Sequence, residues 1–393
     1  MCTAGYIALM SRPQTVSRRA LLSAGGACFA GSFLLDSWLF DAAAADDGGV
    51  VWQQRWGDAT HRKFTSASPD PSALSEVWTT SPDRAGSLTV ECIGPDSVYA
   101  RDYDRLIAYS RSDGTTEWVY SADEGSLSSP SLVGDTLLVQ ENATVHAVDT
   151  GDGSARWTGA FAPSQQPFST IHARDGDAYL PGQRTYFEID PDTGFQRRSF
   201  DAGTLGTLVA AADDSLFWWA DGTLRATDST GAVRWTASLG RSNPPSGRAL
   251  AVTDDAVLVR HLSPADGPAV TSLARTDGSV RWSTGEGIDG SVAVTAGPEA
   301  VYVGTDFEVR GLDTATGDTR WTVATGGGAP QPVATPERAF VPTASGIVPT
   351  EPTTGDQNGV KPLPGRSVSS LAVAPGSVYA VADGELVGLE VAA

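Results

Sequence analysis

Lysine is nearly absent from this sequence. It occurs only at Lys63 and Lys361, so arginine supplies 25 of the 27 basic residues in a chain of 393. Acidic residues number 47, and the formal net charge is −20. Nucleic acids bind to basic surfaces, so this charge argues against a nucleic-acid partner. Many short Asp side chains with so little lysine indicate a hydrated, halophilic surface, and we expect the fold to need salt.

Cysteine is also scarce, which excludes a disulfide framework. The three cysteines are Cys2, Cys28 and Cys92, and only Cys92 lies outside the N-terminal leader described below. No intrachain disulfide is therefore available in the body of the protein. The stretch "SLTVECIG" around Cys92 is typical of a strand, and we expect a small buried residue there.

The sequence has few histidines and no metal-binding pattern. His61, His146, His172 and His261 are far apart in the sequence, and we expect them at isolated turn or surface positions. Phrases such as "DTGDGS" (149–154) lack the order of acidic residues found in calcium loops. We therefore predict no metal site.

The first 45 residues are typical of an export leader. Arg18 and Arg19 in "SRRALL" precede a moderately apolar run that ends at Leu35, which is the pattern of a twin-arginine signal. Small residues at 42–45 offer a cleavage site. Cys28 is an alternative site of lipid attachment. Whether the leader is cleaved, retained or lipidated stays open, and we expect the body to lie outside the cell or at its surface.

A ten-residue phrase recurs along the rest of the chain, for example "VDTGDGSARW" (148–157) and "LDTATGDTRW" (312–321). Its final position marks eight repeats at intervals of 37–47 residues: Trp78, Trp118, Trp157, Arg198, Trp235, Trp282, Trp321 and Gly359. Each phrase follows short runs of alternating apolar residues, which indicate strands. Four strands in each repeat of about 40 residues, repeated eight times, predict an all-β, eight-bladed β-propeller with four antiparallel strands per blade.

The two ends of the repeat array predict how the ring closes. Trp78 opens a fourth strand that lacks its first three, whereas the last repeat ends after three strands at "VYAVADGELVGLEV" (378–391). The two partial sets complete one shared blade, which leaves no free sheet edge at the seam. The domains expected are the leader (1–45), an extension that leads into the ring (46–75) and the propeller (76–393).

The repeated phrase has a structural explanation. Asp opens a turn by accepting bonds from backbone amides, and Gly supplies the positive φ that the turn requires. A Trp on the outermost strand can lie across the gap to the next blade and donate its N–H to a carbonyl. We therefore assign blade docking to Trp78, Trp118, Trp157, Trp235, Trp282 and Trp321.

The D-x-x-T-G-x-x-x-W phrase resembles the PQQ-like (quinoprotein) β-propeller repeat family over about residues 50–393, and "WQQRWGD" (52–58) is similar to the start of its secreted members. The chain is similar to a haloarchaeal-type exported member and to scaffold-type propellers more than to quinone dehydrogenases. A resemblance to the quinone dehydrogenases would imply two adjacent cysteines, a calcium site of Glu and Asn, and a catalytic Asp. This sequence has no adjacent cysteines, and its three asparagines match no such site, so we expect no PQQ or other cofactor and no catalytic residues.

The function expected is a non-enzymatic, monomeric scaffold that binds protein or polymer partners through its ring faces. A quinone- or metal-dependent oxidoreductase and a small-ligand sensor are the alternatives. We expect contact with a membrane only through the leader or a lipid. Asn142 stands in the sequon "NAT" at an expected hairpin tip and is a candidate glycosylation site. One of Trp218 and Trp219 is expected to pack between sheets, and the other to approach the channel or rim. Residues 260–270 are expected to form an extended loop.

Overall fold

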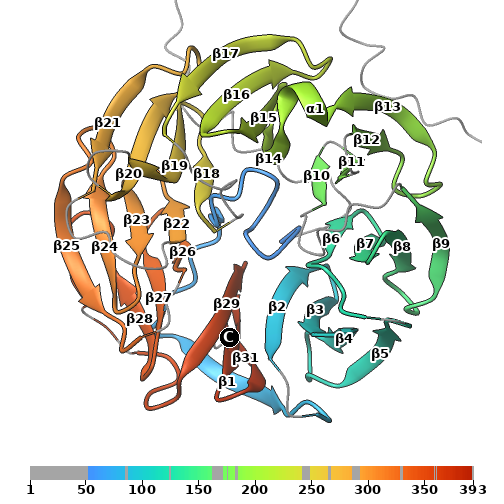
Figure 1. Cartoon of the computed structure of the whole chain (residues 1–393). Coiled ribbons are helices and arrows are strands. Elements are labelled where there is room, and N and C mark those ends of the chain that lie inside the picture. Colours follow the sequence, from blue (N-terminus) through green and yellow to red (C-terminus); the bar gives the residue numbers. More distant parts are fainter. Residues whose placement is uncertain are drawn as a thin grey trace, which may run out of the picture. The chain divides into compact units, whose positions relative to one another are not determined.

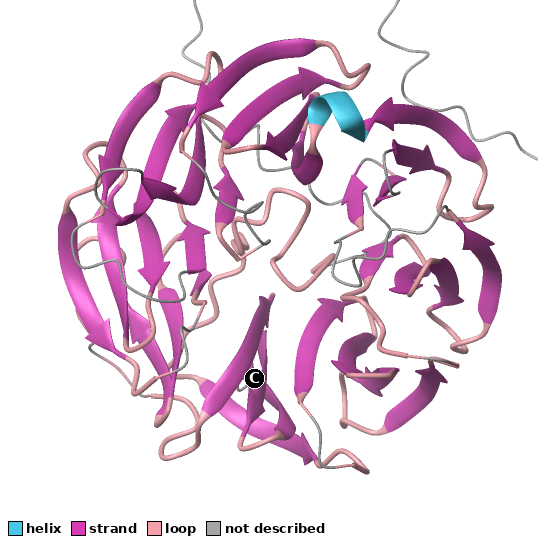
Figure 2. Ribbon diagram, viewed as in Figure 1, coloured by secondary structure: helices cyan, strands magenta, loops and turns pink. Residues whose placement is uncertain are grey.

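The computed structural model describes residues 52–84, 87–123, 125–161, 171–174, 176–181, 185–240, 248–263, 267–285, 293–327, 331–357, 359 and 361–391. All of them lie in the unit Ala45–Ala393. They form 31 strands and one short helix, α1 (Ala202–Leu205), arranged as eight sheets around a ring (Figures 1 and 2). The predicted all-β, eight-bladed propeller is confirmed.

The first four sheets are antiparallel meanders that run from the ring's centre outwards (Figure 1). Blade 1 contains β2 (Leu88–Ile93), β3 (Ser97–Asp102), β4 (Arg105–Ser110) and β5 (Thr116–Ser121). Blade 2 contains β6 (Ser131–Val133), β7 (Thr136–Glu141), β8 (Thr144–Asp149) and β9 (Ala155–Ala160). Blade 3 contains β10 (His172–Arg174), β11 (Asp177–Pro181), β12 (Thr185–Ile189) and β13 (Gln196–Asp201). Blade 4 contains β14 (Thr207–Ala212), β15 (Ser215–Ala220), β16 (Thr223–Asp228) and β17 (Val233–Ser238).

The remaining sheets continue the pattern. Blade 5 contains β18 (Leu250–Val252), β19 (Ala256–Ser263), β20 (Gly267–Ala274) and β21 (Val280–Thr284). Blade 6 contains β22 (Ala293–Ala296), β23 (Ala300–Gly304), β24 (Glu308–Asp313) and β25 (Thr319–Ala324). Blade 7 shows β26 (Val333–Ala334), β27 (Ala339–Thr343) and β28 (Gly346–Thr350). Blade 8 contains β29 (Val368–Ala374), β30 (Ser377–Ala382) and β31 (Glu385–Val391), joined by β1 (Leu74–Thr80).

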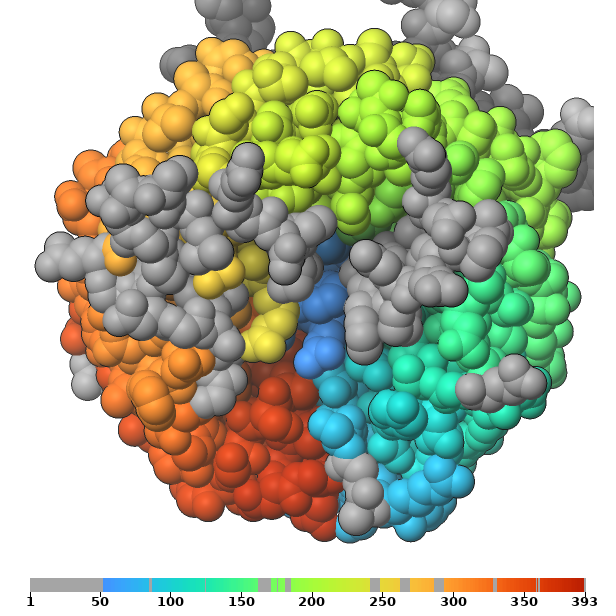
Figure 3. Space-filling model, in the orientation of Figure 1, coloured from blue at the N-terminus to red at the C-terminus, as the bar shows by residue number. Residues whose placement is uncertain are grey.

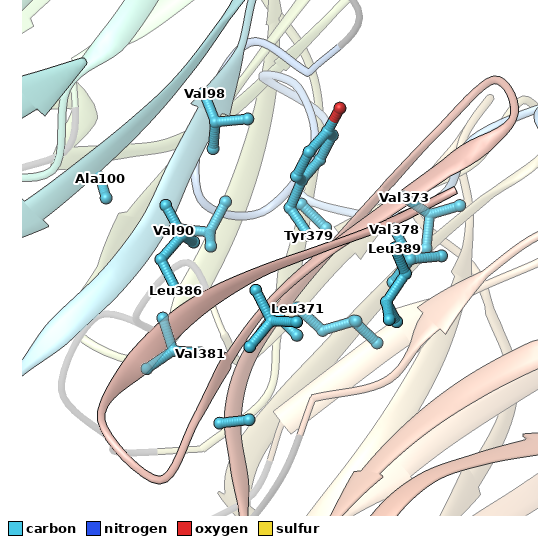
Figure 4. Close-up of a cluster of buried hydrophobic side chains, with 14 of the residues drawn as sticks. Val90, Val98, Ala100, Leu371, Val373, Val378, Tyr379, Val381, Leu386 and Leu389 are labelled. Carbon is cyan, nitrogen blue, oxygen red and sulfur yellow. The ribbon is translucent and has the colours of Figure 1, made fainter. Parts of the chain in front are cut away.

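The ring closes as the sequence predicts. β1 pairs antiparallel with β31, and Trp78 lies opposite Gly388. The sheet order is β1-β31-β30-β29, so the first strand of the chain is the outermost strand of the last blade. Side chains from blade 8, such as Tyr379 and Leu386, pack beside Val90 and Val98 of blade 1 in one buried cluster (Figure 4). The seam between blades 8 and 1 is therefore packed with buried apolar side chains.

The six repeated Trp residues share one arrangement at the seams between blades. Each indole N–H donates to a backbone carbonyl in the turn of the following blade, at 2.8–2.9 Å: Trp78 to Arg111, Trp118 to Thr150, Trp157 to Pro191, Trp235 to Arg275, Trp282 to Thr314 and Trp321 to Pro352. Five of the six side chains are buried, and Trp157 is half-buried. One repeated contact thus joins successive blades at their outer strands.

The Gly of the phrase has a second role that its backbone conformation alone does not explain. Gly317 has a φ of +77°, and a Cβ built there would come within 2.5 Å of the Trp282 ring. The same contact recurs between Gly278 and Trp235, at 2.4 Å. The Gly of one blade therefore lacks the Cβ that would clash with the Trp ring of the preceding blade, and the ring packs directly against its backbone.

The seam between blades 3 and 4 has Arg198 where the other repeats have Trp. Its guanidinium donates to the Ser229 carbonyl in the next turn, as the indoles do elsewhere. The apolar contact with the turn glycine, Gly231, comes instead from Phe200 on the same strand. At this seam, Arg198 makes the hydrogen bond and Phe200 makes the apolar contact, whereas one Trp makes both at the other seams.

Blade 7 departs from the expected four strands, because its described residues form three. The marker position Gly359 lies outside any strand. The chain beyond it carries Pro362 and Pro364, and proline cannot donate to a strand ladder. The edge of β28 is met instead by a single bond from the Ile347 N–H to the Pro362 carbonyl, at 2.9 Å.

Candidate functional site

Residues 52–65, here called the channel segment, run across the centre of the ring (Figure 1). Their backbone pairs with the innermost strands of six blades. The contacts join Trp52 to Ile93, Gln53 to Leu132, Ala59 to Ala211, Thr60 to Val252, Arg62 to Ala296, and Lys63 and Thr65 to Ala334. Atoms of this segment are visible at the centre of the space-filling view (Figure 3). The segment thus links six of the eight blades through backbone bonds, including blades that are not neighbours in the ring.

The channel segment closes one particular face of the ring. Most of its partners, among them Ile93, Ala211 and Ala296, stand at or next to the last residue of an innermost strand. In an antiparallel meander those ends share a face with the Asp–Gly turns between third and fourth strands. We call this the turn face. The opposite face, with the hairpins between second and third strands, is called the hairpin face.

The local sequence explains the sharp course of the segment. Gly57 has a φ of +97°, and a Cβ there would meet the Lys63 Cα at 3.3 Å. The Gly57 and Gln54 backbones bond to each other, and the Lys63 N–H donates to the Trp56 carbonyl at 3.0 Å. Asp58 accepts from the Thr60 N–H at 2.9 Å. The "WGD" of the sequence is therefore a tight reversal inside the ring.

A pair of buried imidazoles lies at this reversal. His61 and His172 are each 1% exposed, and their rings stack with centroids 5.1 Å apart. Neither ring nitrogen of His61 has a hydrogen-bond partner among the described residues, whereas His172 Nε2 lies 3.3 Å from the Leu208 carbonyl. Burial, and secondarily the nearby His172, hold the pKa of His61 well below its ordinary value. Burial lowers the pKa of His172 to about 4, so both rings are neutral at pH 7.

A buried lysine stands two residues further along the segment. Lys63 is 6% exposed, and burial together with the charges of Arg55 and Arg248 lowers its pKa to about 7, although Glu91 opposes this. Burial and Arg55 also lower the pKa of Arg248. Glu91 is fully buried and accepts a bond from Arg101 at 3.1 Å. Cationic groups therefore exceed anionic ones at the centre of a strongly acidic protein.

The histidine expectation was wrong, because all four side chains are buried. His146 Nδ1 lies 2.7 Å from the Tyr120 hydroxyl and Nε2 lies 3.5 Å from Glu141, while His261 lies 2.7 Å from the Thr271 hydroxyl. In the described part of the chain, no group of three or more His, Cys, Asp or Glu is arranged to hold a metal ion. Isolation in the sequence gave no information about burial, because burial depends on where the channel segment and the neighbouring blades lie.

Other predicted positions divide between agreement and correction. Asn142 is exposed at the β7–β8 hairpin, with a φ of +52°. Trp218 and Trp219 do point to opposite sides of blade 4, but both are buried between sheets, so neither reaches the channel or rim. The residues expected as a loop at 260–270 belong mostly to β19 and β20, two strands of eight residues each.

Cys92 is fully buried, and its thiol donates to the Gln53 carbonyl at 3.1 Å. Arg18, Arg19 and Cys28 lie outside the described residues. Within the described ranges, no helix has the length and apolarity required to cross a membrane. The single cysteine of the propeller thus holds the channel segment against blade 1.

Two exposed aromatic residues stand at the tips of equivalent hairpins. Tyr103 lies between β3 and β4 and is 67% exposed, and Phe307 lies between β23 and β24 and is 73% exposed. Phe195, in a turn on the opposite face, is 69% exposed. Large aromatic side chains in such positions are common contacts in protein interfaces. Each ring face therefore carries at least one exposed aromatic side chain.

Comparisons with known proteins agree with this architecture. The family model for "Outer membrane protein assembly factor BamB" matches residues 36–199 and 220–393. No curated protein matches the chain in sequence. Similar solved structures include the computationally designed Ika8 protein (17% identity, TM-score 0.62, 81% of this chain and 99% of that chain) and BamB from Moraxella catarrhalis (16%, 0.59, 81% and 99%). Quinohemoprotein alcohol dehydrogenase from Comamonas testosteroni is also similar (11%, 0.66, 89% and 81%). At these identities the solved structures show the shared fold.

Proposed function

Since this chain belongs to the family of outer membrane protein assembly factor BamB, we propose that it is an exported, non-enzymatic propeller that binds protein or polymer partners at the cell surface. The observation that carries the proposal is the channel segment. It fills the turn-face end of the ring's axis with the protein's own backbone. A partner on the turn face would therefore contact the rim and not the axis, and loops on a rigid scaffold usually carry function.

We propose that the protein works without a quinone. The described residues around the axis are a neutral imidazole pair, buried cations and the backbone of the channel segment. The one propeller cysteine is committed to the Gln53 carbonyl. These groups do not fit a quinone held under a pair of adjacent cysteines. No catalytic step is therefore assigned to this site.

Photo-crosslinking on intact cells tests the proposal and identifies the ring face. A benzophenone amino acid replaces Tyr103 or Phe307 on the hairpin face, or Phe195 on the turn face. We expect light-dependent adducts with a discrete partner from one face, while the other face serves as the matched control. Absence of adducts at all three positions, together with dye-linked alcohol oxidation after addition of PQQ and calcium, would establish the oxidoreductase instead.

Export has its own test. Changing Arg18 and Arg19 together to Lys preserves the charge of the leader but removes the pair that the twin-arginine route requires. We expect this variant to accumulate inside the cell in folded form. Cys28→Ser is the matched control and should leave release unchanged. Normal export of the double variant contradicts the proposed route, and release of a membrane-held protein by Cys28→Ser shows lipidation.

A further inference from the structure

The stacked imidazoles of His61 and His172 have no role in the scaffold function, although they lie where the channel segment meets the ring. His61 belongs to the segment, and His172 lies on β10, the innermost strand of blade 3. Each side chain is 1% exposed, and the ring centroids are 5.1 Å apart. Two residues before His61, the Ala59 carbonyl accepts from the Ala211 N–H of blade 4 at 3.0 Å. The pair is therefore part of the attachment of the segment to blades 3 and 4.

The hydrogen bonding of the pair suits only neutral rings. His172 Nε2 lies 3.3 Å from the Leu208 carbonyl, so Nε2 carries the proton and Nδ1 holds the lone pair. Neither that Nδ1 nor either nitrogen of His61 has a hydrogen-bond partner among the described residues. A second proton on either ring creates a buried, charged N–H group without an acceptor, which is costly. Charging both rings also places two cations side by side.

The segment and the innermost strands around the pair supply no compensating negative charge. Strands β6 and β14, which flank β10, carry no ionisable side chain, and neither do β15 and β18. The one carboxylate of the segment, Asp58, accepts from the N–H and the hydroxyl of Thr60. The other charged groups of the segment are cations: Arg55, Arg62 and Lys63. Protonation of His61 therefore adds to an excess of positive charge on its own segment.

The outer strands of blade 3 carry carboxylates, but these pair with arginines of β13. In the strand register His172 lies opposite Tyr179, and Tyr179 lies opposite Glu188. Glu188 thus faces the pair only across a phenol, and it lies 3.8 Å from Arg198. The remaining ionisable side chains of β10, β11 and β12 are Arg174, Asp177, which pairs with Arg197, and Tyr186. No carboxylate in the described part of the chain therefore contacts either imidazole.

We propose that the pair is an acid-sensitive latch, in which protonation of His61 and His172 releases this part of the channel segment and opens the turn-face end of the axis. Release hydrates His61 and uncovers His172, so both charged rings gain water as a hydrogen-bond acceptor. The latch is closed at pH 7, when both rings are neutral. The device is separate from partner binding at the rim, because it acts on the segment that fills the axis.

The direction of the pH dependence follows from the two states. Burial lowers the pKa of His172 to about 4 and holds that of His61 well below 6.5, whereas released side chains regain the ordinary value of 6.5. Between these values the released form binds protons that the closed form does not, so acid favours release. The equilibrium constant for release should rise by up to about tenfold for each pH unit and each histidine as the pH falls from about 6.5 towards 4.

Amide exchange measures the latch directly. The N–H groups of Ala211, Val252 and Ala296 belong to the ring but donate to carbonyls of the segment, so their protection depends on its position. Hydrogen–deuterium exchange is measured on the whole protein at constant molar salt from pH 7 to 4.5 and corrected for the intrinsic rate at each pH. These three amides should lose protection at least about tenfold, while amides of the β23–β24 ladder keep theirs. Equal loss in both sets is global unfolding and overturns the proposal.

Two variants separate the latch from other acid-sensitive groups. His61→Phe keeps an aromatic ring that cannot be protonated, so the loss of protection should become about half as steep with pH. His146→Phe is the matched control and should behave like the wild type. The His146 ring lies at another seam, 2.7 Å from the Tyr120 hydroxyl and 3.5 Å from Glu141, where a carboxylate compensates its proton. An equal response of His61→Phe and the wild type contradicts the latch.

Imidazole NMR of the wild type decides the question if His61→Phe does not fold. The chain has four histidines, so their ring signals can be assigned by substitution of the other three one at a time. The signals of His61 and His172 should become those of protonated rings only over the pH range in which Ala211 loses its protection. Protonation of either ring while that amide stays protected shows that the closed ring tolerates the charge, and the proposal is then wrong.

Discussion

The seams between blades and the centre of the ring are built in opposite ways. At the seams, one contact is repeated: an indole lies on a glycine and donates to a turn carbonyl, as Trp282 does with Gly317 and Thr314. At the centre, a segment without repeats places buried polar and charged groups, among them His61 and Lys63, against many blades. A repeated contact uses apolar packing that every blade can supply, whereas a single axial segment must satisfy different neighbours at each step. The packing that stabilises the ring is therefore repeated at the seams between blades, whereas the contacts of the channel segment are different at each blade.

Removing the strand that joins the two ends should have the largest effect. Deletion of 74–80 exposes the edge of β31 and opens the seam between blades 8 and 1. We expect loss of the cooperative unfolding transition of the whole propeller, because each blade is held by its neighbours. Circular dichroism during thermal unfolding measures this. A variant that keeps the wild-type transition and frays only at blade 8 would show that the seam is dispensable.

Disrupting a single seam between two blades should have the next largest effect on stability. Trp321→Ala removes a nearly buried indole and its 2.9 Å bond to Pro352, and it should cost about 3–5 kcal/mol of unfolding free energy. Arg198→Ala, at the equivalent position of the Arg seam, is the matched control. Its side chain is 44% exposed, and the change should cost under about 1 kcal/mol. Equal costs in denaturant unfolding would mean that the indoles do not dock the blades.

Two glycines separate backbone strain from packing. Gly317 and Gly376 have φ values of +77° and +70°, but a Cβ would touch Trp282 only at Gly317. Gly376→Ala should cost about 1 kcal/mol from strain alone, and Gly317→Ala about 2–4 kcal/mol because the indole must also move. Denaturant unfolding of both variants measures the difference. Identical costs would reduce the role of the phrase glycine to its backbone conformation.

The buried Lys63 at the centre of the ring should make the free energy of unfolding depend on pH. The folded pKa of Lys63 is about 7, while the unfolded side chain keeps its ordinary value of 10.5. Between these values the unfolded chain binds a proton that the folded chain does not, so the free energy of unfolding should rise with pH, by up to about 1.4 kcal/mol per pH unit. Denaturant unfolding from pH 7.5 to 9.5 in oxyanion-free buffer measures the slope. Lys63→Met should flatten it, and an equal slope in that variant would assign the effect to other groups.

The sequence predicts the seams between blades far better than it predicts the course of the channel segment. Trp spacing and the unpaired strand at Trp78 give the blade number and the closure, because repeated side-chain packing must leave a repeated pattern. The channel segment is bound mainly through backbone amides and carbonyls, which any residue possesses, so its place has no such pattern. The burial of His61 and His172 follows from that place and was missed for the same reason. The unusual presence of Lys63 in a lysine-poor chain was the one available signal.

Closure by β1 also determines when the fold can form. Ser81, just after β1, bonds to Glu385 across 304 residues of chain, and the channel segment needs innermost strands from almost every blade. Contacts between such distant residues form late and slowly in folding. β1 must therefore remain unpaired until β31 has emerged, and an incomplete chain exposes strand edges that favour aggregation. The twin-arginine export that we propose would transport the propeller only after it has been completed inside the cell, and this order would limit that exposure.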